Sequence, residues 1–260
     1  MDVDAMMHRV SPPPSGRGIM WYRNALDGGI IAIPPGMHTL IVGRTGSGKS
    51  RLISQILINL LPGILNGTAI AYGVDLKNGI ELGAWEHWLQ GLADEPDKVV
   101  SLLENVDRTR QERNRNLREH NQTKVAIGPD TPVIVLVIDE LAELSGAVGK
   151  DDKARQEQCQ RLLDRILRLG RSAGITVVAA SQDPRKESLP LRDRFPNRIA
   201  LALGSKAETI MMMGEDAVKD GCAPHTIPTD LPGTGYWHDL LHRRAVRFRT
   251  INSAGLEGFE

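Results

Sequence analysis

The chain has 260 residues, of which 41% are hydrophobic and 25% charged; these fractions are typical of a globular domain and exclude a disordered or fibrous protein. Its 32 basic and 32 acidic residues balance, so no global field attracts nucleic acid or an anionic membrane, and any DNA contact has to be local. Two isolated cysteines fit neither a metal site nor a disulfide framework, no apolar run reaches the roughly 20 residues of a membrane span, and Met1–Pro14 lacks a signal-peptide core, which together predict a cytoplasmic chain without a membrane segment.

The first residues of the chain predict little regular structure. Residues 11–16 read Ser-Pro-Pro-Pro-Ser-Gly, which indicates an extended or flexible lead-in. Ile30–Ile33 is short and apolar and predicts a small strand, followed by a turn at Pro34-Pro35-Gly36. We therefore expect an N-terminal lead-in over residues 1–35 and a main domain over residues 36–260.

Residues 43–50 match the full pattern G-x-x-x-x-G-K-[ST] of a phosphate-binding loop. Residues 38–42 before it suit a buried strand, and residues 51–61 after it carry apolar side chains at the spacing of a helix face. Glycines let backbone N–H groups and the helix N-terminus face phosphates, Lys49 reaches the β and γ oxygens, and Ser50 offers its hydroxyl to Mg²⁺. The alternative, a glycine-rich turn that opens a helix, is disfavoured by this order of elements. The predicted nucleotide-binding residues are Gly43, Arg44, Thr45, Gly46, Ser47, Gly48, Lys49, Ser50 and Arg51.

A strand and a long helix follow the predicted loop and its helix. Thr68–Val74 predicts a second buried strand, which ends at Asp75-Leu76-Lys77. Asp97–His120 is rich in charge and sparse in apolar residues, which predicts a helix that packs one narrow face. Its arginines are interleaved with glutamates, so we favour a solvated helix face over a nucleic-acid patch.

Two acidic residues follow the next predicted strand. Pro132–Ile138 is almost entirely β-branched or leucine, which is typical of a central parallel strand, and Asp139 and Glu140 come directly after it. Adjacent acids are common on surfaces, but after such a strand in a chain with a phosphate loop we interpret them as a Walker B motif. Asp139 then holds Mg²⁺, directly or through water, and Glu140 orients and polarises the water that attacks the γ-phosphate.

The remaining elements continue to alternate between helix and strand. They are a helix over Arg155–Leu169, strands over Gly174–Gln182 and Arg198–Leu203, and a terminal hairpin from Tyr236-Trp237 and Ala245–Thr250. Alternation of this kind requires an α/β fold with a mostly parallel central sheet flanked by helices.

Gln182 is the third candidate for the chemistry of the site. An uncharged amide at the end of its strand senses the γ-phosphate or holds the attacking water, provided that this strand lies between the strands of Gly43 and Asp139; the alternative is a helix or loop cap. An inserted strand and a glutamate beside the Walker B aspartate separate ATPase motors from the kinase and GTPase branch. Because no Asn/Thr-Lys-x-Asp motif is present to read guanine, we predict ATP rather than GTP.

Taken together, these motifs resemble the motor domain of the FtsK/SpoIIIE family of DNA translocases. The resemblance rests on residues 37–50, 137–144 and 170–182, continues through 195–201 and 205–206, and covers roughly residues 36–236. It implies a RecA-like P-loop ATPase that uses ATP and Mg²⁺ and extends over residues 36–260. It also implies a homo-oligomer, usually a hexameric ring, that pulls double-stranded DNA through its pore.

The same resemblance implies that one arginine acts between subunits. Arg198 matches the position after Phe-Pro-x in the family and is expected to be offered to a neighbour's γ-phosphate, with Arg171 and Arg194 in reserve. The chain departs from the family at Leu76, where Asp-Pro-Lys is typical, and it lacks a membrane-spanning N-terminal region and room for a winged-helix module after Trp237. It therefore looks more like the FtsK-type proteins of actinobacterial plasmids, integrative elements or phages.

Two other functions stay open. Type VII secretion motors share the core of this family and move protein, but they normally carry several such domains in tandem, whereas one phosphate loop occurs here. A nucleotide-binding assembly module that does not hydrolyse ATP is disfavoured by intact Lys49, Asp139, Glu140 and Gln182. The sequence alone leaves the translocated substrate undecided, because pore loops need only local basic or polar groups.

Overall fold

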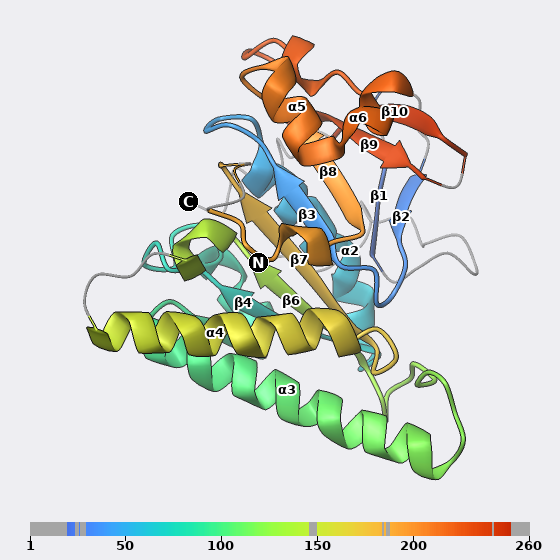
Figure 1. Cartoon of the computed structure of the whole chain (residues 1–260). Helices are drawn as coiled ribbons and strands as arrows, with labels where there is room; N and C mark the ends of the chain where they lie inside the picture. The colour runs from blue at the N-terminus through green and yellow to red at the C-terminus, as the bar shows by residue number, and fades with distance from the viewer. Residues whose placement is uncertain are drawn as a thin grey trace.

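An eight-stranded sheet forms the centre of the computed structural model, which describes residues 20–23, 26, 30–145, 150–183, 185, 188–240 and 242–250 (Figure 1). The strand order is β10-β9-β8-β3-β7-β6-β4-β5. Neighbours from β8 to β5 are parallel, whereas β9 pairs antiparallel with both β8 and β10. The strands are β3 (Thr39–Val42), β4 (Ala69–Val74), β5 (Gly91–Ala93), β6 (Val133–Ile138), β7 (Ile175–Ser181), β8 (Asn197–Leu201), β9 (Thr234–Asp239) and β10 (Arg244–Arg249). The predicted mostly parallel α/β sheet and the terminal hairpin are confirmed.

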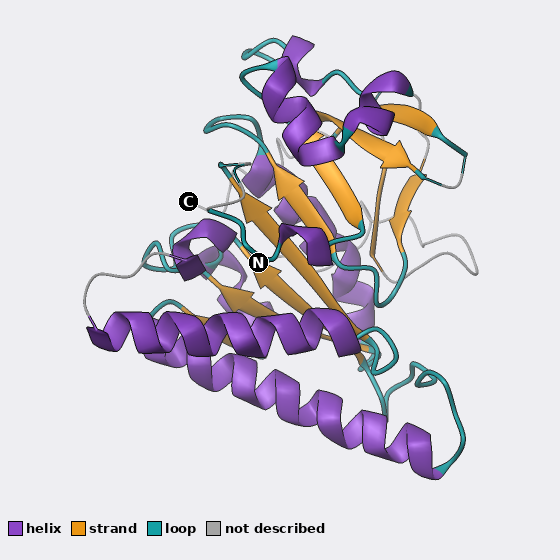
Figure 2. Ribbon diagram, in the orientation of Figure 1, coloured by secondary structure: helices purple, strands orange, loops and turns teal. Residues whose placement is uncertain are grey.

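Helices cover both faces of this sheet (Figure 2). Helices α3 and α4 lie side by side on one face, and α2 covers the other. The helices are α2 (Lys49–Leu65), α3 (Pro96–Glu119), α4 (Lys150–Leu169), α5 (Lys206–Met213) and α6 (Glu215–Lys219), with short 3-10 helices η1 (Gly83–Trp88), η2 (Leu141–Ser145), η3 (Arg192–Arg194) and η4 (Pro224–Thr226).

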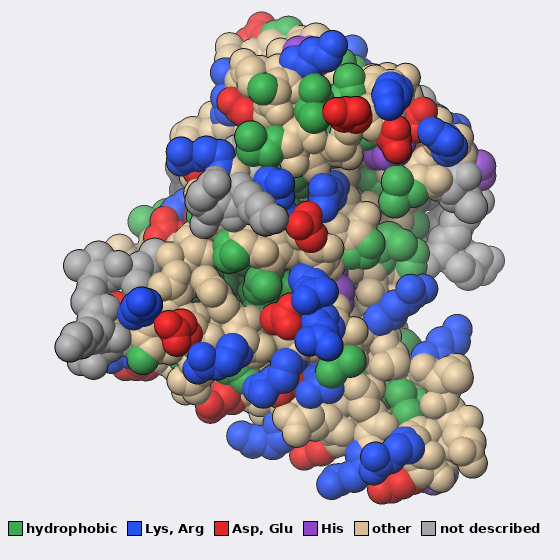
Figure 3. Space-filling model, in the orientation of Figure 1, with side chains coloured by type: hydrophobic (Ala, Val, Ile, Leu, Met, Phe, Trp, Pro, Cys, Tyr) green, Lys and Arg blue, Asp and Glu red, His purple; other side chains and the backbone are tan. Residues whose placement is uncertain are grey.

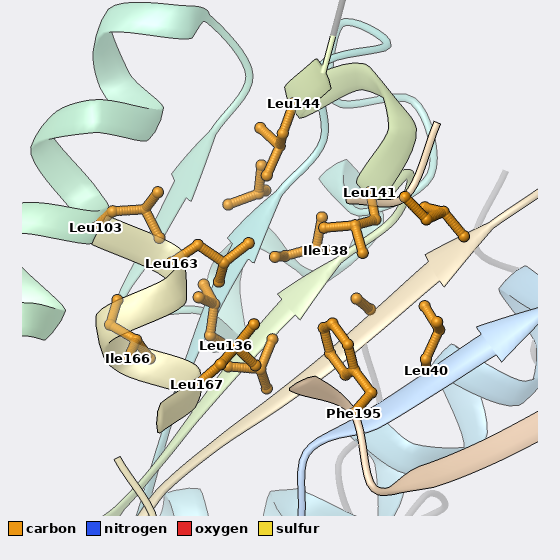
Figure 4. Close-up of a cluster of buried hydrophobic side chains, with 14 of the residues drawn as sticks. Leu40, Leu103, Leu136, Ile138, Leu141, Leu144, Leu163, Ile166, Leu167 and Phe195 are labelled. Atoms are coloured by element: carbon orange, nitrogen blue, oxygen red, sulfur yellow. The ribbon is translucent and has the colours of Figure 1, made fainter. Parts of the chain in front are cut away.

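The two faces of the central strands fill two separate hydrophobic cores, because side chains alternate along a strand. On β6, Leu136 and Ile138 pack with α3 and α4, while Val135 and Val137 pack on the α2 side. Figure 4 shows the first of these cores, where α3 and α4 side chains meet those of β6 and where Phe195 also packs. A strand buried on both faces needs the continuous apolar run that the sequence displays.

The charged helix α3 is tied to α4 by an ion pair to its buried Asp107 as well as by its apolar face. The Arg110 Nε donates to the buried Asp107 carboxylate at 2.7 Å, and Arg165 of α4 reaches the same carboxylate at 3.2 Å. Arg113 donates to the carbonyl of Ala173 at 2.8 Å. Other α3 arginines are exposed, and Figure 3 shows Lys and Arg interspersed with Asp and Glu over this face of the molecule.

Several elements differ from the sequence-based expectations. Helix α4 begins at Lys150, ahead of the predicted start at Arg155. Strands β1 (Met20–Arg23) and β5 and helices α5 and α6 have no counterpart among the predictions. Strand β2 (Ile30–Ile33) occurs as expected and pairs with β1. Because Ile31 and Ile33 are buried in the α2-side core, this part of the expected lead-in packs against the main domain. Residues 11–16 lie outside the described residues.

Two further observations concern the cysteines and the apolar character of the helices. Both cysteines are free and buried, and burial raises the pKa of the Cys159 and Cys222 thiols to about 11. Within the described ranges, none of the helices combines the length and the apolar character that crossing a bilayer requires.

Candidate nucleotide-binding site

The predicted motifs meet at one edge of the sheet, where the carboxyl ends of parallel strands lie together. Strand β7 lies between β3 and β6, with Val42 opposite Ser181 and Ile138 opposite Ala179. The phosphate loop after β3, Gln182 after β7 and the two acids after β6 therefore share this edge. The condition set for a role of Gln182, that its strand lies between the other two, is met.

The phosphate loop is held by its neighbours on both sides. The Gly43 amide donates to the Ser181 carbonyl at 3.2 Å, and the Arg44 amide donates to the Ala202 carbonyl at 3.0 Å. The loop then turns through Gly46 and Gly48, both left-handed at φ 76° and φ 96°. Glycine is required at 48 for a second reason, since a Cβ there would collide with the backbone of Gly233.

Lys49 starts helix α2 with its side chain folded back along the loop. Its Nζ donates to the carbonyls of Gly43 at 2.9 Å and Arg44 at 3.4 Å. The side chain is buried, and desolvation lowers its pKa, opposed by the negative charges of Glu140 and Asp139. A buried ammonium that is desolvated and bonded only to carbonyl oxygens gains from an anion placed against it.

Of the other loop residues, Ser47 is buried, whereas Arg44, Thr45 and Gly46 form an exposed rim. The Ser47 hydroxyl is buried and has no hydrogen-bond partner among the described residues, while the Ser47 carbonyl accepts from the Gly233 amide at 2.7 Å. Ser50 is half-buried in the first turn of α2, and Arg51 next to it is exposed.

Asp139 and Glu140 are both buried at the end of β6. Desolvation raises the pKa of Asp139 to about 6, helped by the negative charge of Glu81 and opposed by Lys77. The Lys77 Nζ lies 3.9 Å from Asp139 Oδ2 and 3.8 Å from Glu140 Oε2, so one cation bridges the two acids.

Lys77 and Asp75 belong to this site although no sequence motif assigned them to it. The Asp75 carboxylate accepts from the backbone N–H groups of Lys77 at 3.0 Å, Glu81 at 2.8 Å and Leu82 at 3.0 Å, which fixes the loop after β4. The signal was available in the sequence, because both residues directly follow a buried parallel strand and such strands end at the same edge as β6.

Glu140 and Gln182 are joined to each other and to the phosphate loop. The Ser181 hydroxyl donates to Glu140 Oε1 at 2.6 Å, and the backbone N–H of Gln182 donates to Glu140 Oε2 at 3.1 Å. The Gln182 side-chain oxygen accepts from the Thr45 hydroxyl at 2.7 Å. The structure thus links the three predicted components through direct hydrogen bonds.

The three candidate arginines lie away from these residues. Arg198 sits near the start of β8 and donates to the Met212 carbonyl at 2.9 Å and to Asp193 Oδ1 at 3.2 Å. Arg194 donates to Asp164 at 2.7 Å. Arg171 lines an open groove of about 800 Å³ beside Pro34 and Gly174, where β3 and β7 begin. In the described part of the chain no hydrogen bond or ion pair joins any of them to the phosphate loop or to the two acids.

This arrangement fits a nucleoside triphosphate with Mg²⁺. The loop provides a glycine-lined backbone, a buried hydroxyl at Ser47 without a hydrogen-bond partner among the described residues, and the desolvated ammonium of Lys49. Oxygen donors, which Mg²⁺ prefers, are present on Ser50 and Asp139. Chemically, the site can bind phosphates and hold a carboxylate beside them.

Known proteins match the chain in sequence. The sequence profile of the FtsK/SpoIIIE family matches residues 14–130, a range that contains the phosphate loop and ends before Asp139. The transfer protein TraSA of Streptomyces ambofaciens is 29% identical over 221 residues, 78% of this chain and 52% of TraSA. The DNA translocase FtsK of Staphylococcus aureus is 28% identical over 198 residues, 68% of this chain and 24% of FtsK. The chain therefore spans about half of one relative and about a quarter of the other.

Solved structures match the chain in fold. The pCW3 conjugation coupling protein TcpA, in a monomer form with ATPγS, has a TM-score of 0.75 at 24% identity and covers 92% of this chain and 67% of its own. The cytoplasmic domain of the type VII secretion ATPase EccC of Thermomonospora curvata has a TM-score of 0.64 at 21% identity and covers 96% of this chain and 32% of its own. The predicted P-loop ATPase fold and the predicted family resemblance are confirmed.

Proposed function

Because the FtsK/SpoIIIE family model matches residues 14–130 and the chain is similar to TraSA and FtsK, we propose that it is an ATP-hydrolysing motor that translocates double-stranded DNA. One observation carries the catalytic half of this proposal. Gln182 joins the two motifs that ATP hydrolysis requires, since its side chain is bonded to Thr45 of the phosphate loop and its backbone N–H to Glu140. Binding of phosphate and activation of water are then coupled through one residue.

The nucleotide is held by residues 43–51. Backbone N–H groups of the loop and the N-terminus of α2 bind the phosphates, and the ammonium of Lys49 exchanges its carbonyl partners for phosphate oxygens. Ser50 and Asp139 are the residues that hold Mg²⁺. When bound, Mg²⁺ neutralises negative charge on the phosphate oxygens.

Glu140 and Gln182 act on the water. The Glu140 carboxylate orients it and accepts its proton as it attacks the γ-phosphate, and the Gln182 amide aligns water and phosphate. Burial of Glu140 favours this role, because a carboxylate removed from bulk solvent interacts more strongly with a water beside it.

The motor works as a homo-oligomeric ring, for which a hexamer is the expected number. Support comes from the arginines: none of the three candidates contacts the site of its own chain in the described structure, so any of them that acts at a γ-phosphate would act on the site of a neighbour. Arg198 is the first candidate for this role. We also expect the ring to work in the cytoplasm.

DNA is the substrate that the sequence relatives favour. TraSA is a transfer protein and FtsK a DNA translocase, and both match more than two thirds of this chain. The likeness to the secretion ATPase EccC extends to the fold, which DNA motors and secretion motors share, and gives no separate support for protein as the substrate.

The ATPase rate measured with and without long duplex DNA tests the proposal. We expect hydrolysis in its absence, a higher rate in its presence, and neither with Glu140→Gln purified in parallel. Hydrolysis that ignores duplex DNA would contradict the DNA motor and favour the secretion or assembly alternatives. A rate equal to that of Glu140→Gln would contradict the ATPase itself.

A further inference from the structure

Ser181 ends strand β7, is fully buried, and donates its hydroxyl hydrogen to Glu140 Oε1 at 2.6 Å. We propose that Ser181 is a positioning residue for hydrolysis, which anchors one oxygen of Glu140 so that the other faces the attacking water. This inference rests on the proposed ATPase function and assigns a role to a residue outside the Walker motifs.

The hydrogen bonds to Glu140 divide unequally between its two oxygens. Oε1 accepts from the Ser181 hydroxyl at 2.6 Å, with the Ala142 amide at 3.4 Å and the Gln182 amide at 3.3 Å also close. Oε2 accepts from the Gln182 amide at 3.1 Å and has the Lys77 ammonium at 3.8 Å. A carboxylate offers about four lone-pair sites, so Oε1 is saturated and Oε2 retains room for a water.

The Ser181 hydroxyl has a clear preference for Glu140. Among the described residues, its single hydrogen has one other acceptor nearby, the Asp183 carbonyl, at the longer distance of 3.3 Å. The Asp183 amide in turn donates to the Ser181 oxygen at 3.3 Å, which occupies the hydroxyl as an acceptor and leaves its hydrogen for Glu140. A hydroxyl bonded to a charged carboxylate forms the shorter and stronger bond.

The position of Ser181 makes it a rigid anchor. Strand β7 is paired on both sides, with β3 and with β6, and the Ser181 carbonyl accepts from the Gly43 amide at 3.2 Å. Ser181 therefore contacts both motifs. Its carbonyl binds the start of the phosphate loop, and its hydroxyl binds the Walker B glutamate. Since catalytic geometry depends on sub-ångström placement, such an anchor affects the chemical step more than binding.

Removal of the hydroxyl should therefore separate turnover from affinity. In Ser181→Ala, Glu140 keeps its charge, its amide partner and Lys77 but loses its shortest bond. We expect kcat to fall about 10- to 100-fold, while KM for ATP and the Kd for a fluorescent ATP analogue change less than about twofold. Ser181→Thr keeps the hydroxyl and should restore most of kcat, whereas Ser181→Cys keeps the size with a weak donor and should stay slow.

A matched control removes another buried hydroxyl from the same strand. The Thr176 hydroxyl, near the opposite end of β7 from Ser181, accepts a hydrogen bond from the Gly36 amide at 2.7 Å, and in the described part of the chain no hydrogen bond joins it to the nucleotide site. Thr176→Val should lower the thermal midpoint and leave kcat near wild type. Thermal midpoints of all variants show whether a loss of kcat exceeds what destabilisation alone produces.

The outcomes separate the inference from the function on which it rests. Wild-type kcat in Ser181→Cys or Ser181→Ala overturns the positioning role, and so does an equal loss of kcat in Ser181→Thr and Ser181→Cys. If Ser181→Ala does not fold, the comparison of Thr with Cys decides. A wild-type protein that hydrolyses no ATP overturns the proposed function and the inference together.

Discussion

The Thr45 hydroxyl donates a 2.7 Å hydrogen bond to the side-chain oxygen of Gln182, a residue 137 positions further along the chain. It connects the exposed rim of the phosphate loop to the end of the strand that separates the two Walker strands. A bound γ-phosphate would meet Gln182 at this rim. We therefore expect the hydrogen bond between Thr45 and Gln182 to differ between the occupied site and the empty one.

Gln182→Ala should keep nucleotide affinity and lose turnover, because it removes the amide that aligns water and leaves the loop and Lys49 intact. We expect kcat to fall about 10-fold or more with the Kd of an ATP analogue unchanged. Thr45→Val removes the partner and not the amide, so its kcat should stay within a few-fold of wild type. Steady-state ATPase assays with parallel binding titrations test both, and an equal effect of the two variants would show that the bond itself, rather than the amide, matters.

Lys49→Ala should abolish productive ATP binding and leave the fold intact. The Lys49 ammonium donates to two loop carbonyls and fills no part of either hydrophobic core. Its loss leaves phosphate charge uncompensated, which we expect to lower kcat/KM on the order of 10²-fold or more. ATPase assays and circular dichroism measure the two halves of this statement, and near-wild-type turnover in the variant would refute the site assignment.

Glu140→Gln should bind ATP and stall before hydrolysis. The amide keeps the shape and an acceptor for Ser181 but cannot take a proton from water. A loss of about 10² to 10⁴ in kcat is the range for a general base. Rapid-quench measurement of a single turnover, with binding measured separately, tests it; equal losses of binding and turnover would instead make Glu140 structural or a metal ligand.

Much of this site follows from the sequence, because motif order and strand pattern determine where strands end. A parallel sheet puts Gly43, Asp139 and Gln182 at one edge once β7 is inserted between β3 and β6. The partner of Glu140 does not follow in the same way. Ser181 reaches it because of the register between β6 and β7, and Lys77 because Asp75 fixes the loop after β4; both depend on packing.

The elements absent from the predictions are short. Strand β5 has three residues and α5 has eight, which is shorter than the roughly four residues for a strand and about 11 for a helix over which a repeating apolar pattern is recognised. Helix α5 still carries a readable start signal. Ser205 accepts from the Glu208 amide at 3.1 Å while Glu208 accepts from the Gly204 amide at 2.8 Å, a capping interaction that the spacing Ser-x-x-Glu indicates.

Stability should fall between pH 6.5 and pH 4 through His38. Its Nδ1 accepts from the Val177 amide at 3.0 Å, and burial lowers the pKa of its imidazole from 6.5 to about 4, with the positive charge of Arg171 adding to the effect and the Leu167 carbonyl opposing it. The unfolded chain therefore binds the extra proton first, and the folded state loses up to about 3 kcal/mol as the pH falls through this window.

Denaturant unfolding at several pH values, compared between wild type and His38→Gln, measures the contribution of His38 to the free energy of unfolding. The difference between proteins is needed because Asp139, whose pKa is raised to about 6, contributes with the opposite sign over the same range. His38→Gln should lose less stability than wild type as the pH falls through this window. The exposed His87→Gln should follow the wild-type curve. Parallel pH curves for wild type and His38→Gln would show that folding does not lower the pKa of His38.

Arg198 gives the sharpest test of the ring. In a single chain its guanidinium is held by the Met212 carbonyl and Asp193, away from the nucleotide site, so it acts only if a neighbour's site approaches it. Hydrolysis should then rise with protein concentration and with duplex DNA. Arg198→Ala should bind nucleotide normally and hydrolyse poorly, since an arginine supplied in trans contributes about 10³ to 10⁵ in rate.

Mixing Arg198→Ala with Lys49→Ala should rescue activity, because the mixed ring contains interfaces with an intact phosphate loop on one side and an intact arginine on the other. Asp193→Asn is the matched control: it weakens the ion pair within the chain and leaves the guanidinium, so its activity should equal or exceed wild type. ATPase rates of the mixtures are measured after co-assembly is verified by light scattering. If co-assembled mixtures stay inactive, Arg198 is not the residue that acts in trans, and Arg194 and then Arg171 become the candidates for the same complementation test.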